Sequence, residues 1–134
     1  MWLAGVLATR EEGSAAVESV FSIVVLIFIV LGVVEVAFGL YARNVVAASA
    51  HEGARAAIER GRTPAEAQAI AAATVRRAAG GLVDDLGVVV GLQPAGDRVT
   101  VSVVVTGRAD PFGPIPWPMS LRAQARAVGE TTPP

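Results

Sequence analysis

The longest hydrophobic stretch of the chain lies near its beginning. From Ser19 to Tyr41 the only charged residue is Glu35, and the run from Ser19 to Val34 has no charge at all. As a helix, with a rise of about 1.5 Å per residue, this segment is about 34 Å long, enough to cross a hydrocarbon core of about 30 Å. The pattern therefore predicts a membrane-spanning helix.

The helical pattern continues beyond this stretch. Residues 42–59 are rich in alanine, lack proline and contain one glycine, Gly53. One face of this helix is mixed rather than hydrophobic, because both apolar and charged side chains follow one another along it at steps of three and four residues: Val45, Ala48, Glu52 and Arg55. We expect a single helix that continues from the membrane to about Arg60 and is broken at Gly61 and Arg62.

A second helix begins at a clear start signal. Thr63 can cap it, Pro64 suits the first helical position, and Glu66 can bond back to the cap. The helix is expected to run to about Ala79 and to end at Gly80 and Gly81. One face, predicted to pack on a sheet, carries Ile70, Ala71, Thr74, Val75 and Ala78.

The periodicity then changes to that of strands. A short strand is expected at Val88–Val90, followed by a turn at Pro94–Asp97, and alternation marks two further strands at Arg98–Thr106 and Ser120–Val128. Four prolines make Asp110–Pro118 irregular. The inward face of the first alternating strand is predicted to pack on the helix at 64–79 through Val99, Val101, Val103 and Val105. In the last strand, Leu121, Ala123, Ala125 and Ala127 alternate with Arg122, Gln124 and Arg126.

These elements predict an α+β fold. A long N-terminal transmembrane helix continues into a soluble helix, and a second helix packs on a small antiparallel sheet of two to three strands. A cleaved signal peptide is the alternative for the first segment, with Ala48-Ser49-Ala50 as a cleavage site. Signal peptides have hydrophobic regions of about 7–15 residues. The greater length here favours a retained anchor.

Charge and composition exclude several classes of function. The net charge is −1, so no nucleic-acid partner is expected. The chain has no cysteine and one histidine, His51, which leaves no nucleophile–base set, and no glycine-rich phosphate loop is visible. We expect no enzyme activity, no catalytic residues, no cofactor, no metal site and no small-molecule substrate. A solvated turn is expected at Asp84 and Asp85.

Taken together, the chain resembles the TadE-like family of Tad/Flp pilus assembly proteins. The segments that carry the resemblance are Gly13-Ser-Ala-Ala-Val-Glu18 before the hydrophobic stretch, Gly32-Val-Val-Glu35 near its far end, His51-Glu-Gly-Ala-Arg-Ala-Ala57 beyond it, and a closing alternating strand that ends at Glu130. One departure is the pair Glu11 and Glu12, where pilin leaders usually carry a basic residue.

The resemblance implies a membrane-anchored minor pilin or pseudopilin of Tad (Flp) type IV pilus assembly. A prepilin peptidase would cut after Gly13 and leave Ser14 as the first residue, with Glu18 four positions later. The chain would then divide into a leader (1–13), a transmembrane pilin-like helix (14–41), an extracytoplasmic domain (42–130) and a tail (131–134). Other pilins or Tad assembly components would be its partners in the membrane or in surface pili.

The expected topology conflicts with the distribution of arginine. The resemblance implies a single-pass membrane protein whose N-terminus is cytoplasmic and whose domain is extracytoplasmic. Four arginines follow the span, whereas only Arg10 precedes it: Arg43, Arg55, Arg60 and Arg62. A count of positive charges alone would place the domain in the cytoplasm. We follow the motif.

Four residues of the hydrophobic helix are candidates for helix packing and assembly: Glu18, Gly32, Glu35 and Gly39. Glu18 can instead be a residue of the helix start at the headgroup level. Glu35 shares a face with Gly32 and Gly39, and it can either reach the membrane interface or face a partner helix.

A second hypothesis treats the chain as a monomeric binding module, membrane-tethered or secreted. It would recognise a ligand through the proline-rich loop around Trp117. That tryptophan can be an exposed contact, a lid over the sheet or an anchor at the membrane interface.

Overall fold

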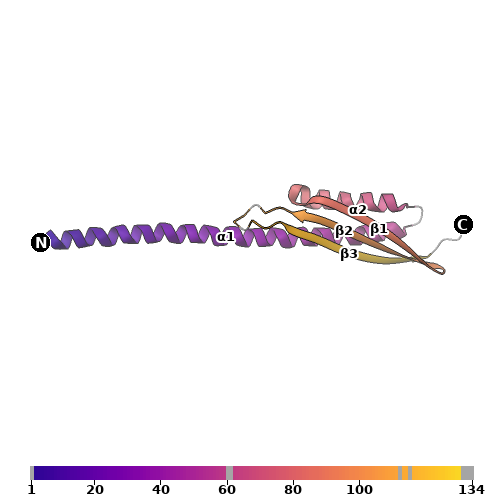
Figure 1. Cartoon of the computed structure of the whole chain (residues 1–134), viewed down its shortest axis with the longest axis horizontal. Helices are drawn as coiled ribbons and strands as arrows, with labels where there is room; N and C mark the ends of the chain where they lie inside the picture. Colours follow the sequence, from indigo (N-terminus) through magenta and orange to yellow (C-terminus); the bar gives the residue numbers. More distant parts are fainter. Residues whose placement is uncertain (1, 60–61, 112, 115, 131–134) are drawn as a thin grey trace.

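A single helix, α1 (Trp2–Ile58), forms the axis of the molecule in the computed structural model (Figure 1). The structure describes residues 2–59, 62–111, 113–114 and 116–130, with side chains from residue 13 onward. Helix α1 passes without interruption from the hydrophobic stretch into the alanine-rich segment, as predicted. It ends at Ile58, close to the expected end near Arg60; of the expected break at Gly61 and Arg62, Gly61 lies outside the described residues, as does Arg60.

The second helix, α2 (Pro64–Ala79), begins as its sequence predicted. The Glu66 amide donates to the Thr63 hydroxyl (3.2 Å), and the Thr63 amide donates to the Glu66 carboxylate (2.7 Å), which completes a capping box. The helix ends at Gly80, whose φ of 54° lies in the left-handed region that glycine tolerates. A short 3₁₀ turn, η1 (Gly80–Leu82), leads to the sheet.

Three antiparallel strands follow in the order β1-β2-β3: β1 (Asp84–Ala95), β2 (Arg98–Ala109) and β3 (Met119–Glu130). Gly96 and Asp97 make the two-residue turn between β1 and β2, and Gly96 has a φ of 66°. The predicted strand at Val88–Val90 is therefore much longer, because β1 pairs with β2 along nearly its whole length. The other two strands also extend beyond their predicted ends.

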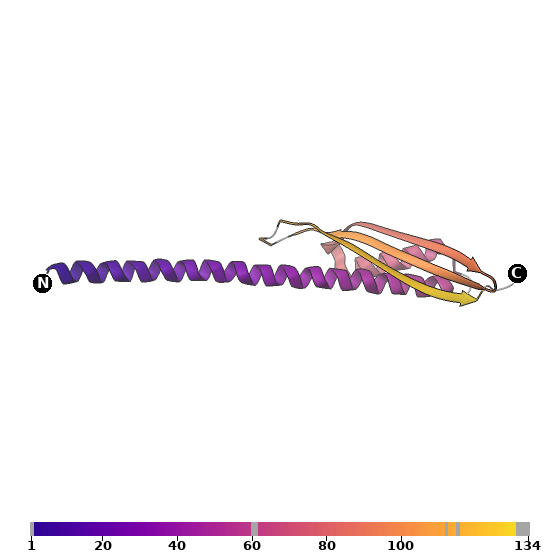
Figure 2. The same ribbon diagram turned by 60° about the horizontal axis from the view of Figure 1, so that its bottom comes forward.

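Both helices cover the same face of the sheet (Figures 1 and 2). The valine face of β2 is buried as predicted, with Val101, Val103 and Val105 fully inaccessible and Val99 half-buried. The helix against it is not the predicted one, however. Strands β2 and β3 pack mainly on α1, and α2 packs on α1 and β1. The prediction that this face packs on residues 64–79 was wrong, because α1 takes the central place under the sheet.

The buried face of α1 consists largely of small residues: Gly39, Ala42, Val46, Ser49, Gly53 and Ala56. Their alternating spacing of three and four residues keeps them on one side of the helix and lets the sheet approach closely. Ser49 satisfies its buried hydroxyl by donating to the Val46 carbonyl (2.8 Å). The mixed face that we identified from Val45 and Glu52 lies beside this stripe, with Val45 buried and Glu52 exposed.

The buried face of α2 also differs from the prediction at one end. Ala71 and Val75 are buried, but the stripe continues to Ala67 and Ala79. Ala78, which we expected to face the sheet, is exposed. Its carbonyl instead accepts a hydrogen bond from the Tyr41 hydroxyl of α1 (2.7 Å), which ties the C-terminal end of α2 to α1.

Candidate functional site

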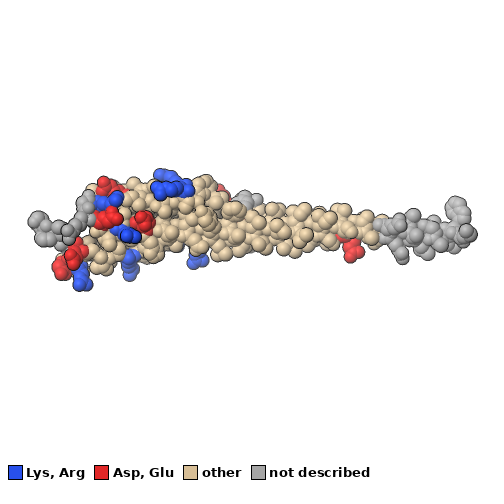
Figure 3. Space-filling view, turned by 180° about the vertical axis from the view of Figure 1, so that it is seen from behind, with Lys and Arg blue, Asp and Glu red and all other residues tan. Residues whose placement is uncertain are grey.

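The N-terminal half of α1 lies apart from the rest of the fold. Every described residue from Gly13 to Leu31 is exposed, although most of these side chains are large and apolar. The helix that contains them is long and apolar enough to cross a membrane by length and composition, and no part of its apolar window is buried. Figure 3 shows that the charged side chains gather over the domain, with a long uncharged stretch of helix beyond it.

The predicted processing residues lie at the start of this exposed segment. Gly13, Ser14 and Glu18 are all exposed and helical, and a Cβ atom at Gly13 would have no neighbour within 4 Å. Next to Glu18, the Ser19 hydroxyl donates to the Ala15 carbonyl one turn earlier (2.9 Å). No described residue from another element approaches these positions, so the segment is accessible from all sides.

The other three candidates of α1 separate into two environments. Gly32 has open space beside it, with nothing within 4 Å of an added Cβ. Gly39 is covered by Met119 at the start of β3, whose Cε atom would lie 2.6 Å from such a Cβ. Glu35 is half-buried, because Gly113 of the β2–β3 loop lies against its carboxylate. The fold thus brings Glu35 and Gly39 to its own loop, and leaves Gly32 and Glu18 away from it.

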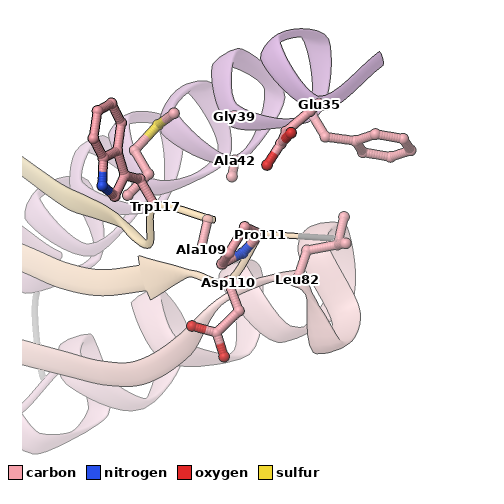
Figure 4. A pocket seen from close by; sticks show the side chains of 10 residues that line it. Glu35, Gly39, Ala42, Leu82, Ala109, Asp110, Pro111 and Trp117 are labelled. Carbon is pink, nitrogen blue, oxygen red and sulfur yellow. The ribbon is translucent and has the colours of Figure 1, made fainter. Parts of the chain in front are cut away.

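A small pocket of about 40 Å³ lies between α1 and this loop (Figure 4). The Glu35 carboxylate is directed from α1 toward the loop segment that carries Pro111. The remaining lining is mainly apolar and comes from α1, η1, β2, the β2–β3 loop and β3: Phe38, Gly39, Ala42, Leu82, Ala109, Asp110, Pro111, Trp117 and Met119. The two carboxylates of the lining are Glu35 and Asp110, and Asp110 is paired with Arg108.

Arg108, near the end of β2, pairs with two acidic side chains next to the loop. It forms ion pairs with Asp85 (3.1 Å) and Asp110 (3.0 Å). The hydrogen bond to Asp110, together with the charges of Asp85, Asp110 and Asp84, raises the pKa of the Arg108 guanidinium. Asp85 has a φ of 50° at the irregular start of β1, so the predicted turn at Asp84 and Asp85 is a bulged strand end.

The remaining candidates show no geometry for metal binding. His51 is exposed on α1, and its Nδ1 atom lies 2.9 Å from the Ala47 carbonyl. Within the described residues, no group of three or more histidine or acidic side chains could hold a metal ion. The cleavage alternative at Ala48-Ser49-Ala50 falls inside α1, and cutting there would remove Ala42, Val46 and Ser49 from the core.

The sequence interpretation did not identify the contact between the proline-rich loop and α1. Its only visible signal is the stripe of small residues that begins at Gly39, since a glycine or alanine at every third or fourth position allows close packing. Neither Met119 nor Gly113 belongs to a sequence pattern that would predict this contact. Their role depends on a loop that folds back over residues about 80 positions earlier.

Comparison with known proteins gives one finding. Neither the curated proteins nor the solved structures contain a match to the chain. Among protein-family models, the one described as TadE-like protein matches residues 13–55, which comprise the exposed anchor and most of the buried part of α1. The chain therefore carries a TadE-like segment at residues 13–55, and the family resemblance expected from its motifs is confirmed there.

Proposed function

We propose that the chain is a membrane-anchored minor pilin or pseudopilin that acts in Tad (Flp) pilus assembly. The observation that carries the proposal is the TadE-like match over α1, a family associated with pilin-like proteins of the Tad pilus. The exposed apolar segment from Gly13 to Leu31 supports it, because a helix of this kind is stable only in lipid or against other apolar helices. The partners are thus the membrane and other pilins or Tad components.

In this proposal a prepilin peptidase cuts between Gly13 and Ser14. The bond lies on an exposed helix with no neighbouring element among the described residues, which supports access by a protease. The N-terminus then lies in the cytoplasm and the sheet domain outside it. Arg43 and Arg55, both exposed beyond the span, oppose this topology by charge count, whereas the TadE-like match supports it.

Maturation can be tested with Gly13→Ala. The variant should remain full length, because the added methyl group lies at the bond that the peptidase must accept. Gly32→Ala is the matched control: it adds a methyl group to the same helix at another open position, and it should be processed normally. Intact mass of the membrane-extracted protein, from cells that contain the peptidase, measures both. A full-length wild-type protein in those cells would refute cleavage.

Glu18 gives a test of assembly that is separate from maturation. Once cut, the chain would begin with a positive α-amine at Ser14, one helical turn from Glu18 in its own or a neighbouring subunit. Pairing of these charges offsets their desolvation in an apolar bundle, and only a subunit in the correct register would satisfy both. Glu18→Gln should therefore be processed and membrane-bound, yet fail to support piliation and bind pilins more weakly.

Glu52→Gln is the control for that experiment, since Glu52 is an exposed carboxylate on the domain part of α1. It should leave piliation unchanged. Normal piliation by Glu18→Gln at wild-type protein level would contradict an assembly role. An uncut, monomeric protein in the membrane would instead favour a tethered binding module, with the exposed Trp117 as its contact.

A further inference from the structure

The β2–β3 loop, of which residues 110–111, 113–114 and 116–118 are described, is the part of the domain that extends farthest toward the anchor. In both ribbon views it reaches back along α1 beyond the end of α2 (Figures 1 and 2). Its position is fixed by contacts at two levels of α1, with Gly113 against Glu35 and Met119 against Gly39. The loop is therefore held at a definite height along the anchor.

That height coincides with the edge of a bilayer. If Glu18 marks the headgroup level at one side, Glu35 lies about 26 Å and Gly39 about 32 Å along the helix, at about 1.5 Å per residue. A hydrocarbon core is about 30 Å thick. The loop contacts of α1 thus lie on either side of the opposite boundary, where the acyl chains meet the headgroups.

The composition of the loop suits that environment. The sequence has no charged residue from Pro111 to Leu121. Four of the nine loop residues are prolines, which have no amide N–H group, so fewer backbone donors need partners where water is scarce. Arg108 and Asp110 pair with each other at the base of the loop, on the side of the domain.

Trp117 is the residue most suited to contact lipid. Its side chain is 79% exposed, more than any other large hydrophobic side chain of the described residues. Tryptophan has an apolar ring system and one N–H donor, and it concentrates at the boundary between acyl chains and headgroups. Tyr41 lies on α1 close to the same level and is also exposed.

From these observations we propose that the loop is a second membrane contact, which rests on the lipid surface on the domain's side with Trp117 among the headgroups. The loop also covers Glu35, so that a carboxylate located just inside the boundary faces protein rather than acyl chains. The inference depends on the membrane anchor of the proposed function. It is independent of cleavage and of pilus assembly.

The test uses the full chain in phosphatidylcholine vesicles, with Trp2→Phe to leave Trp117 as the single tryptophan. Lipids brominated near the top of the acyl chain quench only indoles that reach this depth. Trp117 should emit at shorter wavelength than an exposed indole and should be quenched severalfold more than a tryptophan held in water.

The matched control moves the indole to the far end of the sheet. In the Trp2→Phe, Trp117→Phe background, Val128→Trp places it on β3 at a position 58% exposed, near the end of the strand that lies opposite the loop. Equal quenching of the two proteins would overturn the proposal. Short-wavelength emission without quenching would also overturn it, because the indole would then be packed on protein, in the pocket or in a neighbouring subunit.

Flotation of the vesicles distinguishes a failure of the loop contact from a failure of the membrane anchor. If both proteins float with the lipid and Trp117 is not quenched, the loop contact is wrong and the anchor stands. If the protein does not float, the anchor itself is wrong, and the loop proposal falls with it.

Discussion

Three elements, α1, α2 and β2, approach one another closely at Gly53. A Cβ atom there would lie 2.9 Å from the Cβ of Ala71 on α2 and 3.2 Å from Cγ1 of Val103 on β2. Around it the largest fully buried side chains are valines, with no aromatic residue among the described part of the core. A core of valine and alanine holds little apolar area, so single substitutions should have large effects on stability.

Val101→Asp should unfold the sheet domain while the anchor stays in the membrane. Val101 is 0% exposed, and an unpaired carboxylate at that position costs several kcal/mol, comparable with the whole stability of a small domain. Limited trypsin digestion of the detergent-solubilised chain should cut the variant rapidly at its arginines. Val128→Asp adds the same charge to an exposed site and should digest like the wild type. Equal resistance of both variants would mean that the inward face is assigned incorrectly.

Among the elements, α2 and the β1–β2 hairpin follow their local sequence most closely. The capping box at Thr63 and the turn at Gly96 were predictable because both depend on hydrogen bonds and backbone angles within four residues. The sheet side that faces inward was predictable from the alternating valines of β2. The helix that packs against this side of the sheet was not predictable. Helix α1 presents glycine, alanine and serine to the sheet, and these side chains carry little hydrophobic signal.

The capping box makes the stability of α2 dependent on pH. The hydrogen bonds from the Thr63 backbone and hydroxyl groups hold the pKa of Glu66 below its ordinary value of 4.5. A lowered pKa in the folded state stabilises the fold above the unfolded pKa, and this contribution is lost as the pH falls through the folded value. Glu66→Gln should therefore be less stable than the wild type at pH 7, with the difference shrinking below about pH 4.5.

Thr63→Ala is the companion variant, because it removes the other half of the capping box. It should lower the free energy of unfolding by about 1 kcal/mol at pH 7. Thermal unfolding in detergent at several pH values measures both changes. A stability difference between Glu66→Gln and the wild type that stays constant from pH 7 to pH 3 would show that Glu66 acts through packing alone.

At the scale of the whole molecule, the anchor and the domain share one element, helix α1. The sequence indicated a boundary near Tyr41, but α1 crosses it without a break and then supplies the central helix of the domain. The loop at residues 110–118 overlaps the anchor as well. The continuity of α1 was predicted from the sequence, but its central place under the sheet and its contact with the loop could not be predicted locally, because both arise from contacts between segments far apart in the chain.

Continuity of α1 fixes the direction in which Glu18 points relative to the sheet. Inserting one alanine between Val33 and Val34 should rotate Glu18 and Gly32 by about 100° relative to the domain and leave the Glu35 and Gly39 contacts intact. If assembly depends on both parts, piliation should be lost. Four inserted alanines return the rotation to within about 40° and should restore part of it. Piliation at the wild-type level in the one-alanine variant, with the protein membrane-bound, would show that anchor and domain act independently.

Because α1 is uninterrupted, a tilt of the anchor also tilts the domain. From Gly39 to the end of the helix at Ile58 is about 29 Å, at about 1.5 Å per residue. Transmembrane helices tilt by about 20° on average, and they tilt more where the bilayer is thinner. A tilt of that size moves the far end of the domain sideways by about 10 Å. In the membrane-anchored protein proposed above, the thickness of the surrounding membrane would therefore set where the outermost turn of the sheet stands above it.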